Sequence, residues 1–416
     1  MSNAGDWIPE NPILAYLQTL IATKKTLPYG QPVAAYISHA HTDSASLLRL
    51  AAELGPHIAI LQVPAEVIDD WGSDTIDELQ YLARKHGFLL WEGSKILNSL
   101  VGFMGRGDAP LETRQALSDL IKKSYASGPI RTATWANVAT SWAPAVAVTQ
   151  QEKDALIPTL RTAAREAVAT TAKTIQTEIS VDRNHDSSED EIEMSVSSES
   201  TSNGWKEFSP DNMGGALRKS STISVTEHKT PHPDVQPENG VPAPPTFARS
   251  ISLCLPSSIN TGFKPEFRQS TIIAALANSD FVLGFATSEP FFVNHRGNDI
   301  FELALMDGCG VAQEGMDCSL LANSPYADKQ GSVTIFSLIP PPLGNDFEYD
   351  PNFKPNGKKV DDSEVPASAQ YLHHIIGQAV AMREQSRQEH RQEHQPNGSR
   401  NEVGPTILHF PAVIIG

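Results

Sequence analysis

The stretch GFLLWEGSKILNSL (87–100) passes from apolar residues into a charged cluster. Its first half, GFLLWEG, is a continuous apolar run bounded by glycines, which is typical of a strand buried on both faces. Such strands occur in parallel sheets that are covered by helices. The cluster that follows contains a lone lysine, Lys95. In a parallel barrel this cluster would lie at the carboxyl end of a strand, where barrel enzymes carry their active sites.

Strand and helix patterns alternate along most of the chain. Apolar residues at helical spacing predict helices over 14–25, 44–54, 74–86, 112–127 and 150–175. Short apolar runs predict eight strands over 32–38, 57–63, 87–93, 132–140, 249–256, 280–287, 332–340 and 410–416. Eight such units fit an α/β fold of the (β/α)8 TIM barrel type, and a doubly wound open sheet is the second interpretation.

The composition changes sharply between the fourth and fifth predicted strands. Residues 176–247 are rich in Ser, Glu, Asp, Asn and Pro and poor in apolar side chains. Such a segment cannot bury enough apolar surface to offset the entropy lost on ordering. We therefore predict a barrel in two parts, 1–175 with strands one to four and 248–416 with strands five to eight. A long disordered insertion over 176–247 would separate them.

The bulk composition limits the classes of function. The 416-residue chain has a formal net charge of −17, which argues against nucleic-acid binding because neutralising phosphates needs a basic surface. Three cysteines without metal-like spacing favour a reducing compartment. No signal peptide is visible, and no apolar run reaches the roughly 18 residues that span a bilayer. We therefore expect a cytoplasmic protein with neither nucleic-acid nor membrane partners.

A second polar loop, HAHTD (39–43), follows the first predicted strand. Its two histidines and Asp43 are residue types that bind metals or act as bases. A spacing of two in an irregular loop is weak evidence for a metal site, however. Capping of the next helix by Asp43 or Ser44 explains the polar residues more simply, and we expect no metal. The repeat RQEHRQEH (387–394) is likewise interpreted as a charged helix end or loop.

Four segments, in order, resemble fungal orotidine 5′-monophosphate decarboxylases. They are ELGPHIAILQVPAEVI (53–68), KHGFLLWEGSKILNSL (85–100), IRTATWANVAT (130–140) and SDFVLGFAT (279–287). An acidic insertion between the fourth and fifth strands is also familiar from the enzymes of filamentous fungi. The resemblance implies a (β/α)8 barrel that forms a homodimer. It also implies a lyase of pyrimidine synthesis that decarboxylates a pyrimidine nucleotide without a metal or a cofactor.

The resemblance further implies where a catalytic array would stand. The family's charged tetrad maps onto Gln62 after the second strand and onto Gly93, Lys95 and Asn98 after the third. Only Lys95 keeps its charge, and Glu66 is the one acidic residue left in the second-strand pattern. Loss of one positioned acid–base or electrostatic group typically lowers a rate by about 10²–10⁴. We therefore expect this barrel not to be an efficient decarboxylase.

Ligand-binding residues follow from the same resemblance. A serine that contacts the pyrimidine corresponds to Ser257 or Ser258, and a Gln-Tyr pair that contacts phosphate corresponds to Gln370 and Tyr371. The family's Gly-Arg-Gly phosphate turn would begin at Gly416, where this sequence stops.

Three functions remain open. The chain is a degenerate family barrel that binds a pyrimidine nucleotide, another small molecule or a protein, or it is an enzyme with new chemistry at Lys95. The third is an active decarboxylase of UMP synthesis. A partly buried lysine without carboxylate neighbours tends towards the neutral form, which suits Schiff-base chemistry on a carbonyl substrate. A relic Lys95 that caps its strand or pairs with Glu92 is the simpler interpretation, and we favour the first function.

Overall fold

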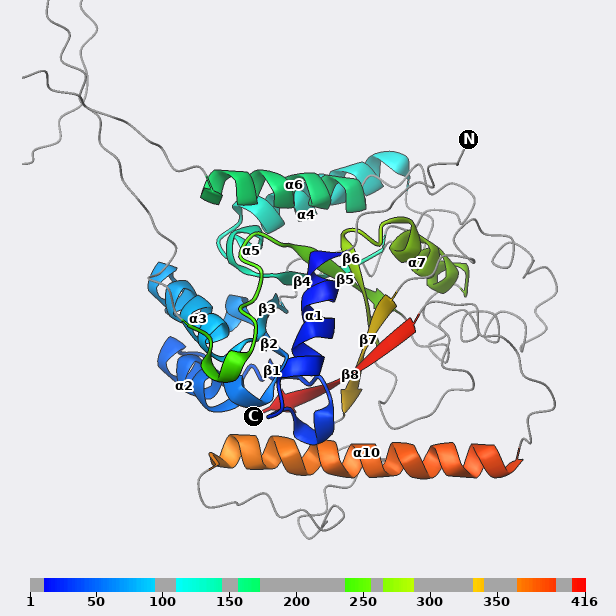
Figure 1. Cartoon of the computed structure of the whole chain (residues 1–416). Helices are drawn as coiled ribbons and strands as arrows, with labels where there is room; N and C mark the ends of the chain where they lie inside the picture. The colour runs from blue at the N-terminus through cyan, green and yellow to red at the C-terminus, as the bar shows by residue number, and fades with distance from the viewer. Residues whose placement is uncertain are drawn as a thin grey trace, which may run out of the picture. The chain divides into compact units, whose positions relative to one another are not determined.

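The computed structural model describes residues 11–93, 110–143, 156–172, 236–255, 265–287, 332–339, 365–393 and 406–416. Eight parallel strands form a closed barrel in sequential order, surrounded by helices (Figure 1). They are β1 Ala34–Ile37, β2 Ile60–Val63, β3 Leu89–Glu92, β4 Val138–Trp142, β5 Ser250–Leu255, β6 Val282–Thr287, β7 Ser332–Ile339 and β8 Thr406–Ile415. The barrel closes because β8 pairs in parallel with both β7 and β1. The predicted TIM barrel is confirmed.

The described helices are α1 Pro12–Thr23, α2 Ser44–Leu54, α3 Ser73–His86, α4 Leu111–Ser127, α5 Thr132–Trp135, α6 Leu156–Ala172, α7 Pro265–Ala277 and α10 Ala367–Glu393. Helix α1 begins at Pro12 because the Asn11 side chain accepts hydrogen bonds from the first free backbone amides. Helix α3 ends at Gly87, whose left-handed φ of 63° favours glycine. Residues 387–393 of the RQEH repeat form the last turns of α10, so a charged helix end is confirmed. None of the described helices is long and apolar enough to cross a membrane.

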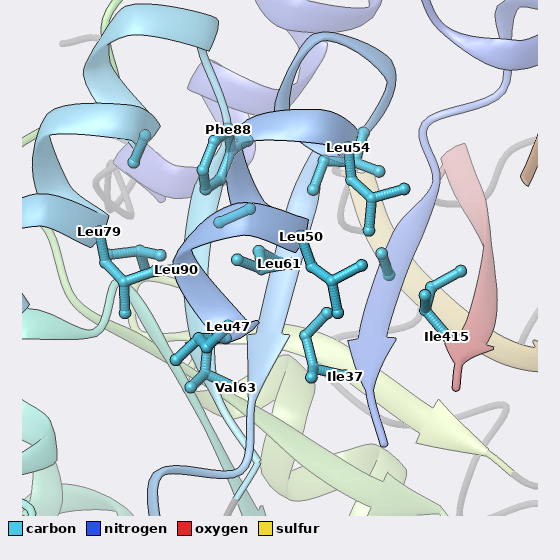
Figure 2. Packing of buried hydrophobic residues seen from close by; sticks show 14 of the residues in the cluster. Ile37, Leu47, Leu50, Leu54, Leu61, Val63, Leu79, Phe88, Leu90 and Ile415 are labelled. Atoms are coloured by element: carbon cyan, nitrogen blue, oxygen red, sulfur yellow. The ribbon is translucent and has the colours of Figure 1, made fainter. Parts of the chain in front are cut away.

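Alternate strand residues face two separate apolar layers, because successive side chains point to opposite faces of a sheet. Inward residues pack with α1, and they include Ala34, Ile60, Leu89, Val138 and Phe410. Outward residues of β1–β3 and β8 pack against α2, α3 and α10. Figure 2 shows this outer layer, in which the labelled side chains are Ile37, Leu47, Leu50, Leu54, Leu61, Val63, Leu79, Phe88, Leu90 and Ile415. A second outer cluster covers β4–β6 beneath α4, α6 and α7.

The amino-terminal end of the barrel is closed by α1 and by the buried side chain of Lys24. The apolar face of α1 packs onto residues at the starts of the strands. Lys24, just after α1, is 2% exposed. The three N–H groups of its Nζ are shared among the carbonyl oxygens of Gly55, Ile58, His86 and Gly87, which lie 2.7, 2.6, 2.8 and 2.9 Å away. The ammonium thereby joins the connections that lead into β2 and β3.

The strand predicted over 132–140 begins later than predicted, because its first residues form the helical turn α5. The Nε1 of Trp135 donates to the Ile130 carbonyl over 3.0 Å, and its ring packs on Trp71 with a centroid separation of 5.0 Å. Buried Arg249 donates to the Ala133 and Thr134 carbonyls over 2.8 and 2.9 Å. These tertiary contacts override the β-propensity of Thr and Trp.

The chain before β5 is packed further upstream than the predicted boundary at 247. Residues 176–235 of the predicted insertion lie outside the described residues. Residues 236–247 are described: the Tyr16 hydroxyl donates to the Pro242 carbonyl over 3.1 Å, and Asn137 Nδ2 donates to the Pro245 carbonyl over 3.1 Å. Val241 is buried with α1 in the inner layer. This segment therefore covers part of the amino-terminal end of the barrel.

Candidate functional site

The candidate site lies at the carboxyl ends of β1, β2 and β3. Tyr36 is the register partner of Gln62, and Gln62 is the register partner of Trp91. Because side chains alternate along a strand, Tyr36, Gln62 and Gly93 share the inward side of Ala34, Ile60 and Leu89. Tyr36 and Gln62 stand one inward position beyond Ala34 and Ile60, and Gly93 stands two beyond Leu89. We call these three residues, together with His39 in the loop after β1, the mouth.

Gln62 fills the space above Gly93. A Cβ atom built on Gly93 would lie 2.8 Å from Nε2 and 3.0 Å from Cγ of Gln62. Any side chain at position 93 therefore requires Gln62 to move. The sequence mapping treats Gln62 and Gly93 as two separate losses of charge. In the structure they are a matched pair, in which a neutral amide packs on a residue without a side chain.

Tyr36 and His39 form a hydrogen-bonded pair beside Gln62. The Tyr36 hydroxyl lies 2.5 Å from His39 Nε2, and the two rings meet edge to face. Burial raises the pKa of Tyr36 to about 12, with a further contribution from the Glu66 and Glu92 carboxylates. Tyr36 is therefore a neutral phenol at physiological pH, and it can donate to His39 while its oxygen lone pairs stay available as acceptors. Tyr36 was not predicted as a site residue, although its place at the end of the first strand, two residues after the inward Ala34, would have indicated an inward side chain at the mouth.

Below the mouth the barrel interior is closed by neutral side chains. Trp91 Nε1 donates to Thr140 Oγ1 on the neighbouring strand over 2.7 Å, and both side chains are buried. Ser252, on the inward face of β5, is also buried, and its hydroxyl has no hydrogen-bond partner among the described residues. A ligand at the mouth would therefore rest on the Trp91 and Thr140 layer.

The polar residues of the HAHTD loop have separate partners. The Asp43 side chain accepts a hydrogen bond from the Ser46 amide over 2.7 Å, which confirms the predicted cap of α2. His41 Nδ1 lies 2.8 Å from Ser46 Oγ, whereas His39 contacts Tyr36. Across the described part of the chain, no group of three or more His, Cys, Asp or Glu residues is arranged to hold a metal.

The remaining predicted site residues are not brought to the mouth by any described contact. Lys95, Asn98, Ser257 and Ser258 lie outside the described residues. Gln370 is exposed in the first turn of α10, and its Nε2 donates to the Val365 carbonyl over 2.8 Å.

Tyr371 is half-buried and packs on the outer layer. Neighbouring α10 residues contact Glu53 and His57, which precede β2 and so lie at the opposite end of the barrel from Gln62. Glu92 is fully buried on the outward side of β3, where the Thr132 hydroxyl donates to it over 3.4 Å.

No family model matches the chain. Curated relatives named orotidine 5′-phosphate decarboxylase nevertheless match part of it. The relative from Aureobasidium pullulans is 32% identical over 128 residues, which are 31% of this chain and 38% of the relative. The relative from Emericella nidulans is 30% identical over 128 residues, again 31% of this chain and 38% of the relative.

The relative from Aspergillus fumigatus is 29% identical over 128 residues, 31% of this chain and 37% of the relative. The match thus spans well under half the length of these curated relatives. Over the matched part, and with a closed eight-stranded barrel, the chain is similar to orotidine 5′-phosphate decarboxylases.

Proposed function

We propose that the chain is a family barrel that binds a pyrimidine nucleotide, or a similar small molecule, at the mouth and decarboxylates orotidine 5′-phosphate poorly or not at all. The observation that carries the proposal is the packing of Gln62 over Gly93. Two positions at which the family resemblance implies charged side chains here hold uncharged residues that fit each other.

The chemistry of decarboxylation supports the same proposal. Loss of carbon dioxide leaves a carbanion, which needs electrostatic stabilisation and a proton donor. The described side chains of the mouth are a phenol, an imidazole and an amide. A phenol with a pKa of about 12 is a poor acid at neutral pH. These groups are better suited to hydrogen bonding with the edge of a heterocycle than to stabilising a carbanion.

The direct test compares turnover with binding in the purified full chain. Loss of orotidine 5′-phosphate absorbance measures turnover, and calorimetry with uridine 5′-monophosphate measures binding. We expect binding without measurable turnover, and we expect Gln62→Ala to change the affinity about tenfold or more. Thr19→Ala, on the exposed side of α1, is the matched control and should change nothing. Turnover at ordinary enzymatic rates, of order 1 s⁻¹ or more, would contradict the proposal.

The absence of both turnover and binding would instead favour the second candidate, chemistry at Lys95. Borohydride trapping with a panel of carbonyl compounds should then label the protein, and Lys95→Ala should abolish the labelling. The homodimer that the resemblance implies stays a prediction, as does a cytoplasmic location. Sedimentation of the purified chain measures the oligomeric state.

A further inference from the structure

Helix α10 is fastened to the rest of the barrel by three described contacts near its amino-terminal half. Ser368 Oγ donates to Glu53 Oε2 of α2 over 2.6 Å. A Cβ built on Gly377 would lie 2.7 Å from the hydroxyl oxygen of Tyr29, so the tyrosine ring sits directly on the glycine. Tyr29 adopts a left-handed φ of 52°, which is costly for a residue with a side chain. The contact with α10 is a reason for that conformation to persist.

The third contact joins two histidines. His373 Nε2 of α10 lies 3.0 Å from His57 Nδ1, which precedes β2, and the two rings are close to perpendicular with centroids 4.9 Å apart. His57 Nδ1 is also 3.3 Å from the Thr26 carbonyl oxygen. One proton on His57 Nδ1 can serve both neighbours if His373 Nε2 is an unprotonated acceptor. With the Thr26 carbonyl as an acceptor, His57 Nδ1 carries the proton, and His373 Nε2 in this arrangement is the unprotonated acceptor.

We infer that the His57–His373 pair is an acid-sensitive latch, which holds α10 against the amino-terminal end of the barrel and loosens when the imidazoles gain protons. A proton on His373 Nε2 would face the proton on His57 Nδ1 across 3.0 Å, so the hydrogen bond would be replaced by repulsion. The only groups that exchange protons in this contact are the two rings themselves.

The environment of the pair lowers the pKa of both rings. Burial lowers the pKa of His57, the hydrogen bond to the Thr26 carbonyl raises it, and the nearby charge of Lys24 lowers it again. Burial, followed by the neighbouring His57, lowers the pKa of His373 from its ordinary 6.5 to about 4. Glu53 of α2 accepts from Ser368, and the adjacent His374 has a partner of its own.

The sign of the pH dependence follows from this lowered value. Docked α10 binds fewer protons than undocked α10, so docking is strongest above pH 6.5 and weakens as the pH falls towards about 4. Loosening would uncover the apolar face of α10, where Leu372, Ile375, Ile376 and Ala379 are buried in the outer layer. That layer covers β8 and β1, so acid would loosen the side of the barrel at which the sheet closes.

Hydrogen exchange of the full chain at pH 7.5 and pH 5.0 tests the latch, with rates corrected for intrinsic exchange. We expect protection of amides 372–379 to fall about tenfold relative to α6, which contains no histidine. His373→Gln keeps a neutral hydrogen-bonding group and should reduce this change to less than about threefold. An equal loss of protection in α10 and α6, or an undiminished tenfold loss in His373→Gln, would overturn the inference.

A second readout needs no variant. Carbon-13 histidine resonances of the wild-type chain, which has 13 histidines, should include one that titrates below about pH 5. If every histidine titrates at pH 6 or above, the latch is wrong even where α10 exchange depends on pH. The mouth, where nucleotide binding is measured, lies at the opposite end of the barrel from the latch. The latch and the proposed function can therefore fail independently.

Discussion

The two ends of the barrel use their polar side chains differently. At the amino-terminal end, Lys24 and Arg249 are both buried, and each contacts four backbone carbonyl oxygens. At the carboxyl end, the described contacts join Tyr36 to His39 and pack Gln62 on Gly93. The first arrangement binds the backbone, whereas the second places polar side chains at the mouth. This contrast matches the division of TIM barrels into a stabilising end and a functional end.

The two ends of the barrel also differ in their buried charges. Two buried cations persist at the amino-terminal end, where removing one would leave several carbonyl groups unpaired. The family resemblance implies charged side chains at two positions of the mouth, which here hold Gln62 and Gly93. This difference between the two ends is what the proposed function expects of a barrel that binds a ligand without decarboxylating it.

The largest expected effect comes from breaking the amino-terminal arrangement with Lys24→Met. The substitution leaves four buried carbonyl oxygens without their donor and should lower the free energy of unfolding by about 3–5 kcal/mol. Burial lowers the pKa of Lys24 to about 7, so urea unfolding is best measured at pH 6, where the ammonium is present. Binding of uridine 5′-monophosphate at the mouth should be unchanged as long as the chain is folded.

Lys25→Met is the matched control for this prediction. Lys25 is adjacent in sequence and exposed, and its Nζ donates to a single carbonyl, that of Ala22, over 2.8 Å. Its substitution should change the free energy of unfolding by less than about 0.5 kcal/mol. Equal changes in the free energy of unfolding for the two variants would show that the contacts of Lys24 with the four carbonyl oxygens do not stabilise the fold.

An intermediate effect is expected from restoring a carboxylate to the mouth with Gly93→Asp. The new Cβ collides with Gln62, so the free energy of unfolding should fall by about 1–2 kcal/mol. In a Gln62→Ala background, most of this loss of stability should disappear. Thermal or urea unfolding of the four proteins of this cycle measures the coupling.

Gly72→Asp is the control for the mouth cycle, because a Cβ there meets no atom nearer than 3.9 Å. It should change the free energy of unfolding by less than about 0.5 kcal/mol. A cost for Gly93→Asp that is the same with and without Gln62 would contradict the matched pair and weaken the proposed function.

The sequence was sufficient for the barrel and insufficient for the details of the site. Continuous apolar strands and helical spacing depend on local pattern, so all eight strands and the bounds of α2 were recognisable. The α5 turn was not recognisable from the sequence, because contacts of Trp135 and Arg249 stabilise it in the folded chain. The packing of Gln62 on Gly93 likewise depends on the register between two strands, so the sequence pattern of either strand alone could not predict it.

The smallest expected effect concerns the Tyr29–Gly377 contact. It tests whether packing at the amino-terminal end stabilises the fold. Glycine inside a helix costs about 1 kcal/mol relative to alanine, so Gly377→Ala should stabilise α10 by about that amount when Tyr29 is first replaced by alanine. In the wild-type background the added methyl group meets the Tyr29 ring at 2.7–2.8 Å, and the gain should vanish. The expected coupling, measured by urea unfolding of the four proteins, is about 1 kcal/mol. Strictly additive effects would mean that the left-handed Tyr29 gains nothing from α10, and that the buried apolar face, the histidine pair and Ser368 hold the helix without it.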